Sequence, residues 1–149
     1  MKRVNISVLT AVCLFVLGCG GGGGSFVSIT EIEPNDDFET AQAITLPLGG
    51  LTGSIYGDND PGDYFSFHLN AGQRIKAILS YADADADVVT AYYTDDGVEQ
   101  DDETYWVNGQ VITTTYVAPS SGLYYFKVYS LELPVTSPAT TYVLTIQII

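Results

Sequence analysis

Cysteine and histidine are scarce in this chain of 149 residues, which has two of the first and one of the second. Protein zinc sites are built from cysteines or several histidines, and a catalytic triad needs a histidine between an acid and a nucleophile. No nucleophile motif lies near His68, which alternates onto the face opposite Phe65 and Phe67. We therefore predict that His68 is a surface residue and that the chain is not an enzyme.

Positive charge is also scarce. Five Lys and Arg residues stand against 18 Asp and Glu residues, for a formal net charge of −13, and the pI is near 4.1. Binding of nucleic acid requires a basic surface that neutralises phosphates. The composition therefore excludes nucleic acid as a partner and favours a soluble surface that attracts cations.

Long hydrophobic runs are missing as well. The apolar run of residues 8–17 is interrupted only by Thr10 and follows the positive pair Lys2 and Arg3. It is too short to span a bilayer as a mature helix, but it suits the hydrophobic region of a signal peptide.

The end of this run, Val16-Leu17-Gly18-Cys19, resembles the cleavage site of bacterial lipoprotein signals. The resemblance implies a signal peptide over residues 1–18, cleavage before Cys19, acyl chains on Cys19 and attachment to the membrane through them. Cys13 would leave with the signal, so the mature domain would have no disulfide. The alternative is a plain secretory signal with a chance cysteine.

A glycine run, Gly20 to Gly24, follows the acylated cysteine and indicates a flexible tether. We expect the acylated cysteine and tether to cover residues 19–28 and one domain to cover 29–149. A glycine rather than an aspartate after Cys19 favours the outer membrane or cell surface, by enterobacterial sorting habits.

Alternation of apolar and polar residues is the dominant pattern after residue 26, where no helical periodicity exceeds about two turns. Apolar residues fall on one face in the segments 65–69, 75–81, 124–128 and 142–148. Counting such segments predicts about eight strands and an all-β fold, an antiparallel β-sandwich of the jelly-roll kind.

Two local signals refine this picture. Asn108-Gly109, between residues 105–107 and 111–113, predicts a two-residue β-hairpin. Residues 38–44 allow one short helical turn.

A series of short motifs occurs along residues 29–147: Glu33-Pro34-Asn35-Asp36, Gly53, Asp60 with Asp63-Tyr64-Phe65, Ala71-Gly72-Gln73, Asp85-Ala86-Asp87, Gly122 to Val128, and Tyr142-Val143-Leu144. In this order they resemble the bacterial pre-peptidase C-terminal domain, a family that includes the collagen-binding modules of clostridial collagenases. The resemblance implies a non-catalytic β-sandwich and, as in several members, a calcium ion between the N-terminal acidic segment and a loop after an early strand.

The metal ligands that the resemblance implies come from these two segments. They are Glu31, Glu33, Asn35 and Asp36 from the first and Asp60 and Asp63 from the second, with Asp58 as a plausible addition because this loop is longer than usual.

The residues agree with such a site. Residues 31–41 contain five carboxylates, one amide and no positive charge. Alternate residues of an extended strand point the same way, so Glu31 and Glu33 can address one ion, and calcium prefers oxygen ligands. The alternative is a solvated acidic loop.

Two further acidic groups are less specific. Asp83, Asp85 and Asp87 favour a turn or a strand cap, with a second metal site as the alternative. The acidic residues between Asp95 and Glu103 are typical of a solvated loop.

Aromatic residues suggest a binding surface. We expect Tyr125 and Tyr129 to face outward beside Lys127, as part of a platform for an extracellular protein or a polysaccharide. Strand propensity alone also explains many of these tyrosines. The sequence as a whole predicts a membrane-anchored, calcium-stabilised binding module on the bacterial surface. The alternatives are an accessory or structural subunit that docks on a separate exported enzyme, and a polysaccharide-binding module.

Overall fold

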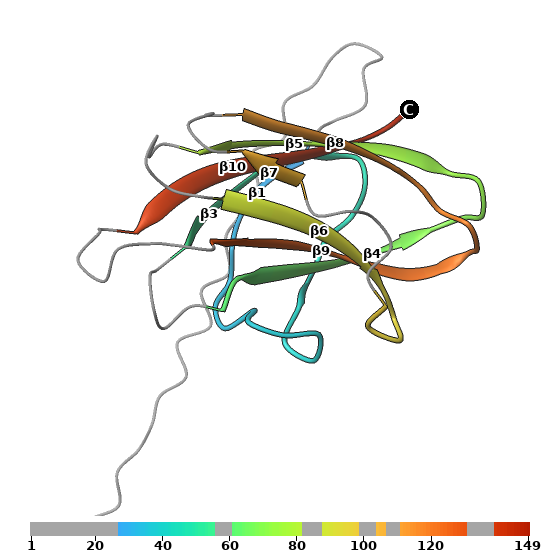
Figure 1. The fold of residues 1–149 in the computed structure, drawn as a ribbon, viewed down its shortest axis with the longest axis horizontal. Helices are drawn as coiled ribbons and strands as arrows, with labels where there is room; N and C mark the ends of the chain where they lie inside the picture. Colours follow the sequence, from blue (N-terminus) through green and yellow to red (C-terminus); the bar gives the residue numbers. More distant parts are fainter. Residues whose placement is uncertain (1–26, 56–60, 82–87, 99–103, 107–110, 131–138) are drawn as a thin grey trace, which may run out of the picture.

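The computed structural model describes residues 27–55, 61–81, 88–98, 104–106, 111–130 and 139–149. Ten strands are found in these ranges, and they form two five-stranded sheets packed face to face (Figure 1). The predicted β-sandwich is therefore confirmed. The proposed signal peptide, Cys19 and the glycine run lie outside the described ranges, and the first strand already begins at Val27.

Sheet A has the strand order β1-β3-β10-β5-β8. Its members are β1 (Val27–Thr30), β3 (Leu48–Ile55), β10 (Thr140–Ile148), β5 (Arg74–Tyr81) and β8 (Val111–Val117). β1 runs parallel to β3, and the other neighbours are antiparallel. Strands far apart in the sequence are thus neighbours, and β10 pairs on both sides.

Sheet B has the order β2-β4-β9-β6-β7. Its members are β2 (Gln42–Ala43), β4 (Asp63–Leu69), β9 (Gly122–Ser130), β6 (Val88–Thr94) and β7 (Thr104–Trp106). β2 runs parallel to β4, and the remaining pairs are antiparallel. Both sheets therefore have one parallel pair at one border.

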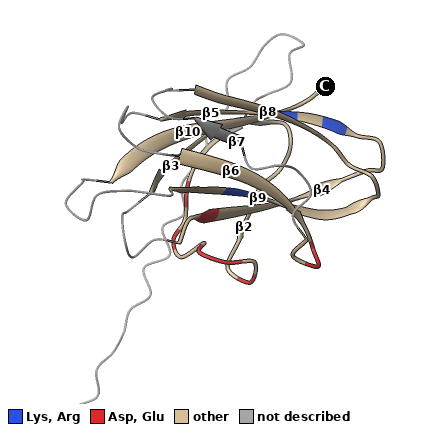
Figure 2. Ribbon diagram, in the orientation of Figure 1, with Lys and Arg blue, Asp and Glu red and all other residues tan. Residues whose placement is uncertain are grey.

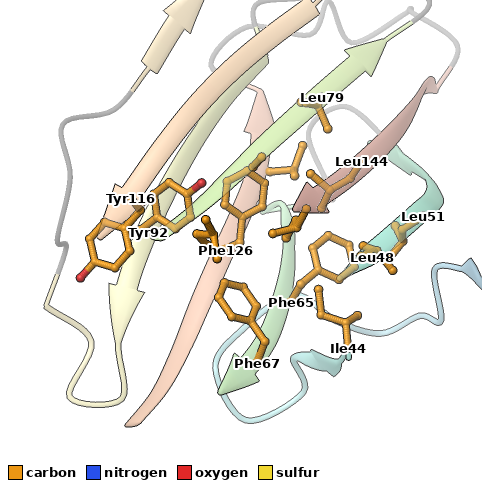
Figure 3. Close-up of a cluster of buried hydrophobic side chains, with 14 of the residues drawn as sticks. Ile44, Leu48, Leu51, Phe65, Phe67, Leu79, Tyr92, Tyr116, Phe126 and Leu144 are labelled. Atoms are coloured by element: carbon orange, nitrogen blue, oxygen red, sulfur yellow. The ribbon is translucent and has the colours of Figure 1, made fainter. Parts of the chain in front are cut away.

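The core lies between the sheets, and the alternation read from the sequence places most of it correctly. Phe65, Phe67 and Phe126 of sheet B face Leu79 and Leu144 of sheet A (Figure 3). The expectation for the end of β10 is wrong, because Ile148 is 45% exposed. The alternating face of β10 therefore leaves the core after Ile146.

The expected hairpin at Asn108-Gly109 is also wrong. The turn itself lies outside the described ranges, but β7 pairs with β6 in sheet B and β8 pairs with β5 in sheet A. The chain therefore crosses from one sheet to the other between them, which a two-residue hairpin does not allow.

Residues 38–44 differ from the expected helical turn. Phe38–Thr40 form a hydrogen-bonded turn, after which Gln42–Ala43 form the short strand β2. Asp37 holds the turn, because its Oδ1 accepts hydrogen bonds from the backbone N–H groups of Glu39 and Thr40 at 2.9 and 2.8 Å. No helix in the described part of the chain is long and apolar enough to cross a membrane.

Candidate metal centre

Glu31 directly follows β1 and extends its pairing with β3, since its backbone N–H donates to the Thr52 carbonyl at 2.9 Å. Its side-chain Oε2 accepts hydrogen bonds from the Ser54 backbone N–H at 2.9 Å and from the Tyr142 hydroxyl at 3.0 Å. The position of this carboxylate is thus set by sheet A.

Gly53 makes room for this carboxylate. A Cβ atom at position 53 would overlap both the Glu31 carboxylate and the end of the Tyr142 ring. Glycine is therefore required here by close approach, at an inward-facing position of β3.

Asp63 brings the second carboxylate from the opposite sheet. It is the first residue of β4 and is fully buried, and its Oδ2 accepts a hydrogen bond from the Tyr142 hydroxyl at 2.5 Å. Tyr142 thus contacts Glu31 and Asp63 through one oxygen atom, yet a hydroxyl has a single proton to donate. The hydroxyl can donate at full strength to only one of the two carboxylates, so a proton or a bound cation would stabilise the second contact.

Burial and neighbouring negative charge shift the pKa values of Glu31 and Tyr142. Burial raises the pKa of the Glu31 carboxyl, and the neighbouring Glu33 raises it further. Burial together with the charges of Asp63 and Glu31 raises the pKa of the Tyr142 hydroxyl far above its ordinary value. Tyr142 therefore stays neutral, and a cation would relieve the carboxylates around it.

Glu33 completes a group of three carboxylates. One oxygen atom each of Glu31, Glu33 and Asp63 lies within 4.8 Å of the others. The Glu33 carboxylate is held by the Asn35 backbone N–H, which donates to its Oε2 at 3.1 Å. Residues from the N-terminal segment and from β4 are thus brought together, as the resemblance implied.

Asn35 adds an independent observation. Its side chain is fully buried, but its amide oxygen and nitrogen have no hydrogen-bond partner among the residues that the structure describes. Buried polar groups without a partner are rare and costly in native proteins. Its backbone carbonyl accepts a hydrogen bond from the Tyr64 N–H at 2.8 Å, which fixes this residue beside β4.

These donors fit a hard cation. Three carboxylates and a neutral amide oxygen are the ligand types that calcium prefers. Two of them, Glu31 and Glu33, accept backbone hydrogen bonds that hold them in place. Of the other predicted ligands, Asp36 is half-buried outside the three-carboxylate group. Asp58 and Asp60 lie outside the described ranges.

Sequence reasoning missed Tyr142 as part of this centre, since a tyrosine on the inward face of a strand is indistinguishable from a core residue.

The acidic residues of Figure 2 lie mostly in connections at one side of the sandwich, whereas the basic residues lie on β5 and β9 (Figure 2). His68 is exposed, as predicted.

The predicted aromatic platform is built differently from the expectation. Tyr125 is not outward and open but only 8% exposed, because the Phe38 ring lies edge-on against it with ring centroids 4.9 Å apart. Tyr129 is half-buried, with the Lys127 ammonium 4.4 Å from its ring centroid. Alternation places Tyr125 on the outer face of sheet B correctly, but the 38–40 turn folds back over this face and covers the ring.

Comparison with known proteins gives the fold. No family model and no curated protein matches the sequence. The pre-peptidase C-terminal domain of a collagenase from Bacillus anthracis matches with a TM-score of 0.52 and 22% identity, covering 72% of this chain and 94% of that one.

Two further solved structures have the same β-sandwich. PliG of Aeromonas hydrophila, a periplasmic inhibitor of g-type lysozyme, has a TM-score of 0.54 and 14% identity, over 73% of this chain and 96% of its own. CorA of Methylomicrobium album BG8, a surface-associated copper-binding protein, has a TM-score of 0.55 and 8% identity, over 73% and 98%. At these identities the likeness is one of fold.

Proposed function

We propose that this chain is an exported, membrane-anchored binding module whose β-sandwich is stabilised by calcium. The observation that carries the proposal is the cluster of Glu31, Glu33 and Asp63 around a tyrosine hydroxyl with one proton, next to a buried amide without a partner. Calcium bound there would join the segment after β1 to β4 and, through Tyr142, to β10.

Calcium suits the donors better than other cations. Magnesium demands a tight octahedron and gives up its water reluctantly, whereas calcium accepts six to eight oxygens in flexible geometry. Copper and zinc favour nitrogen and sulfur ligands, and the three clustered groups offer oxygen alone.

A binding role, rather than a catalytic one, is supported by the surface of sheet B. Tyr64, Tyr93 and Tyr129 are half-buried around Phe38 and Lys127, and Lys127 lies over the Tyr64 and Tyr129 rings at 5.0 and 4.4 Å. Aromatic rings with a polar tip suit a protein or polysaccharide ligand. The likeness to periplasmic and surface-associated proteins supports export, and Cys19 would supply the membrane anchor.

The experiment that tests calcium binding is thermal unfolding of the chain during a calcium titration. Extracellular calcium modules have dissociation constants of about 10⁻⁴ to 10⁻³ M. A tenfold excess over such a constant stabilises the fold by about 1.4 kcal/mol and raises the melting midpoint by about 3–8 °C. Magnesium should give a smaller shift.

Three variants of equal charge change locate the effect. Glu33→Gln and Asp63→Asn should each remove most of the calcium shift, because each loses a carboxylate of the cluster. Glu39→Gln, in the exposed turn of the same segment, should retain it. Equal responses in all three variants, or no response in the wild type, would return the segment to a solvated acidic loop.

The anchor and the ligand have their own tests. Cys19→Ser should abolish labelled-palmitate incorporation and move the protein out of the membrane fraction; unchanged partitioning contradicts the anchor.

An array of matrix proteins and polysaccharides, probed with and without calcium, identifies the ligand class, and a Tyr93→Ala variant locates the ligand on sheet B.

A further inference from the structure

We infer that β8 is an interaction edge at which two copies of this chain pair, joining their A sheets into one continuous sheet across a two-fold axis. The inference does not depend on the metal centre, which lies on other strands. It rests on the four sheet borders, on the direction of the backbone groups of β8 and on the residues that face its open side.

The four sheet borders differ in how they are protected. Natural sheets protect their borders with short strands, bulges, charges or proline. Of the border strands in the described ranges, β1 has four residues and an irregular register with β3, β2 has two and β7 has three. β8 has seven residues, pairs with β5 without any shift, and contains no charge and no proline. β8 alone among these strands lacks such protection.

The backbone groups of β8 alternate between β5 and the open side. Just beyond the strand, the Ala118 N–H donates to the Gln73 carbonyl at 3.0 Å, and on the far side of β5 the Ile149 N–H donates to the Arg74 carbonyl at 2.9 Å. Hydrogen-bonded pairs alternate along an antiparallel ladder. The N–H and C=O groups that point to the open side are therefore those of four residues: Val111, Thr113, Thr115 and Val117.

The outward-pointing backbone groups of β8 in one copy are complementary to those of β8 in a second copy. In an antiparallel pair of two β8 strands centred on Thr114, Val111 lies opposite Val117 and Thr113 lies opposite Thr115. Each of these pairs exchanges two hydrogen bonds, about eight in all, and Thr114 meets its own copy in a pair without hydrogen bonds. The register uses all seven residues of the strand.

The side chains favour this pairing as well. Val111 and Val117 are 55% and 45% exposed. In the pair, Val111 of each copy would cover Val117 of the other. The inward residues Ile112 and Tyr116 are buried within each sandwich, and Thr114 Oγ1 is 2.7 Å from the Tyr92 hydroxyl. Thr–Thr and Val–Val cross-strand pairs stabilise sheets without any charge.

Charge points to a second copy at this border rather than elsewhere on the molecule. The chain has a net charge of −13, so two copies repel over most of their surface, yet no strand of sheet A contains Asp or Glu. The charged residues on β5 beside β8 are Arg74, opposite Val117, and Lys76, opposite Thr115. In the two-fold arrangement each lies about 15 Å or more from its copy, beyond the screening length of about 8 Å.

The experiment is sedimentation equilibrium of the full chain in density-matched non-ionic detergent, so that an acylated protein is measured as it exists. We expect a monomer–dimer equilibrium at concentrations below about 0.1 mM. Thr115→Lys places like charges across the pair and should weaken dimerisation by about tenfold or more. Thr141→Lys, on the same exposed face but on β10, should leave the dimer unchanged.

A pair of cysteines fixes the register. Thr113→Cys combined with Thr115→Cys puts thiols opposite each other across the border, at a Cα separation of about 5.5 Å that a disulfide can bridge. Mild oxidation should give a covalent dimer, whereas Thr141→Cys, which has the same native cysteines, should not. A chain that stays monomeric throughout, or equal effects of Thr115→Lys and Thr141→Lys, overturns the inference and leaves the edge open to a strand of another protein.

Discussion

Two segments of this molecule are rich in acidic residues, residues 31–39 and the turn after β6, and their carboxylates have different surroundings. The segment from Glu31 to Glu39 brings a carboxylate from β4 to two of its own, around a hydroxyl supplied by β10. The turn after β6 holds Asp96 with its nearest neighbours, since Asp96 Oδ1 accepts hydrogen bonds from the Thr94 hydroxyl and from the Val98 N–H.

The pKa directions show the difference. Burial raises the pKa of Glu31, whereas the hydrogen bond from Thr94 lowers the pKa of Asp96. In the turn, hydrogen-bond donors within two residues of Asp96 stabilise its charged form. In the first segment, burial and the neighbouring Glu33 disfavour the charged form of Glu31. The number of acidic residues in a segment does not distinguish these two cases. They differ in whether the groups that donate hydrogen bonds to the carboxylates are close in the sequence or come from distant strands.

The largest expected change in the free energy of unfolding comes from substituting Gly53, which packs against the carboxylate cluster. Gly97, in the acidic turn, gives the comparison. Gly53→Ala should destabilise the fold by about 3 kcal/mol, because the new methyl group overlaps the Glu31 carboxylate and the Tyr142 ring. Gly97→Ala, in the acidic turn, should cost about 1 kcal/mol, since φ there is +75° while the nearest atom is 3.7 Å away. Chemical denaturation measures both.

Gly50→Ala is the matched control on the same strand. Its Cβ would meet ordinary contacts at 3.4 and 4.0 Å, so its free energy of unfolding should be close to that of the wild type. If Gly50→Ala and Gly53→Ala cost the same, strand entropy rather than the carboxylate cluster decides the effect.

A smaller effect is expected for the shared hydroxyl. Tyr142→Phe removes the donor between Glu31 and Asp63 and should cost about 1–2 kcal/mol in the presence of chelator. Thr94→Val removes the corresponding donor to Asp96 in the exposed turn and should cost less. Saturating calcium should reduce the penalty of Tyr142→Phe but not that of Thr94→Val; parallel behaviour of the two contradicts the distinction.

The smallest effect is in the pH dependence of stability. Because the pKa of Glu31 is raised in the folded state, the folded protein binds this proton more tightly than the unfolded one. Without calcium, stability should therefore rise as the pH falls from neutral toward the ordinary value of 4.5, by less than about 1 kcal/mol since water screens this half-exposed group. With calcium, protons compete with the metal and the slope should reverse.

Glu31→Gln tests the sign. It should flatten the slope under both conditions. Asp96→Asn should leave the slope between pH 4 and pH 7 unchanged, because the lowered pKa of Asp96 contributes stability that is constant above the ordinary value of 3.8 and is lost only as the pH falls below it. Melting midpoints measured from pH 4 to pH 7 in chelator and in calcium decide the case. A slope that Glu31→Gln leaves unchanged points to another group.

Much of the fold followed from local pattern. Two-residue alternation identified the inward faces of β4, β5 and β9, since burial on one side of a strand selects every second residue. It failed where the long-range arrangement decides: Asn108-Gly109 has the residues of a hairpin, but its flanking strands belong to different sheets. Tyr125 has an outward position that Phe38 covers from a distant turn.

The candidate site was predicted from its acidic residues, while its organisation was not. The sequence pattern placed Glu31 and Glu33 together, and the family resemblance added Asp63, which the structure brings within reach. Nothing local relates Glu31 to Tyr142, which are 111 positions apart. They meet because β1 and β10 pair with opposite sides of β3. Asn35 could be predicted as a ligand candidate, but its complete burial depends on the packing against β4.

The central position of β10 has a consequence for the order in which the chain folds. β10 comes last among the strands, yet it lies between β3 and β5 in sheet A. Until its residues 140–148 are available, β1–β3 and β5–β8 are separate two-stranded pieces, each marginal alone. Sheet A therefore cannot be completed until the last strand of the chain is available. Because Tyr142 lies on β10, completion of the sheet and closure of the carboxylate cluster then occur together.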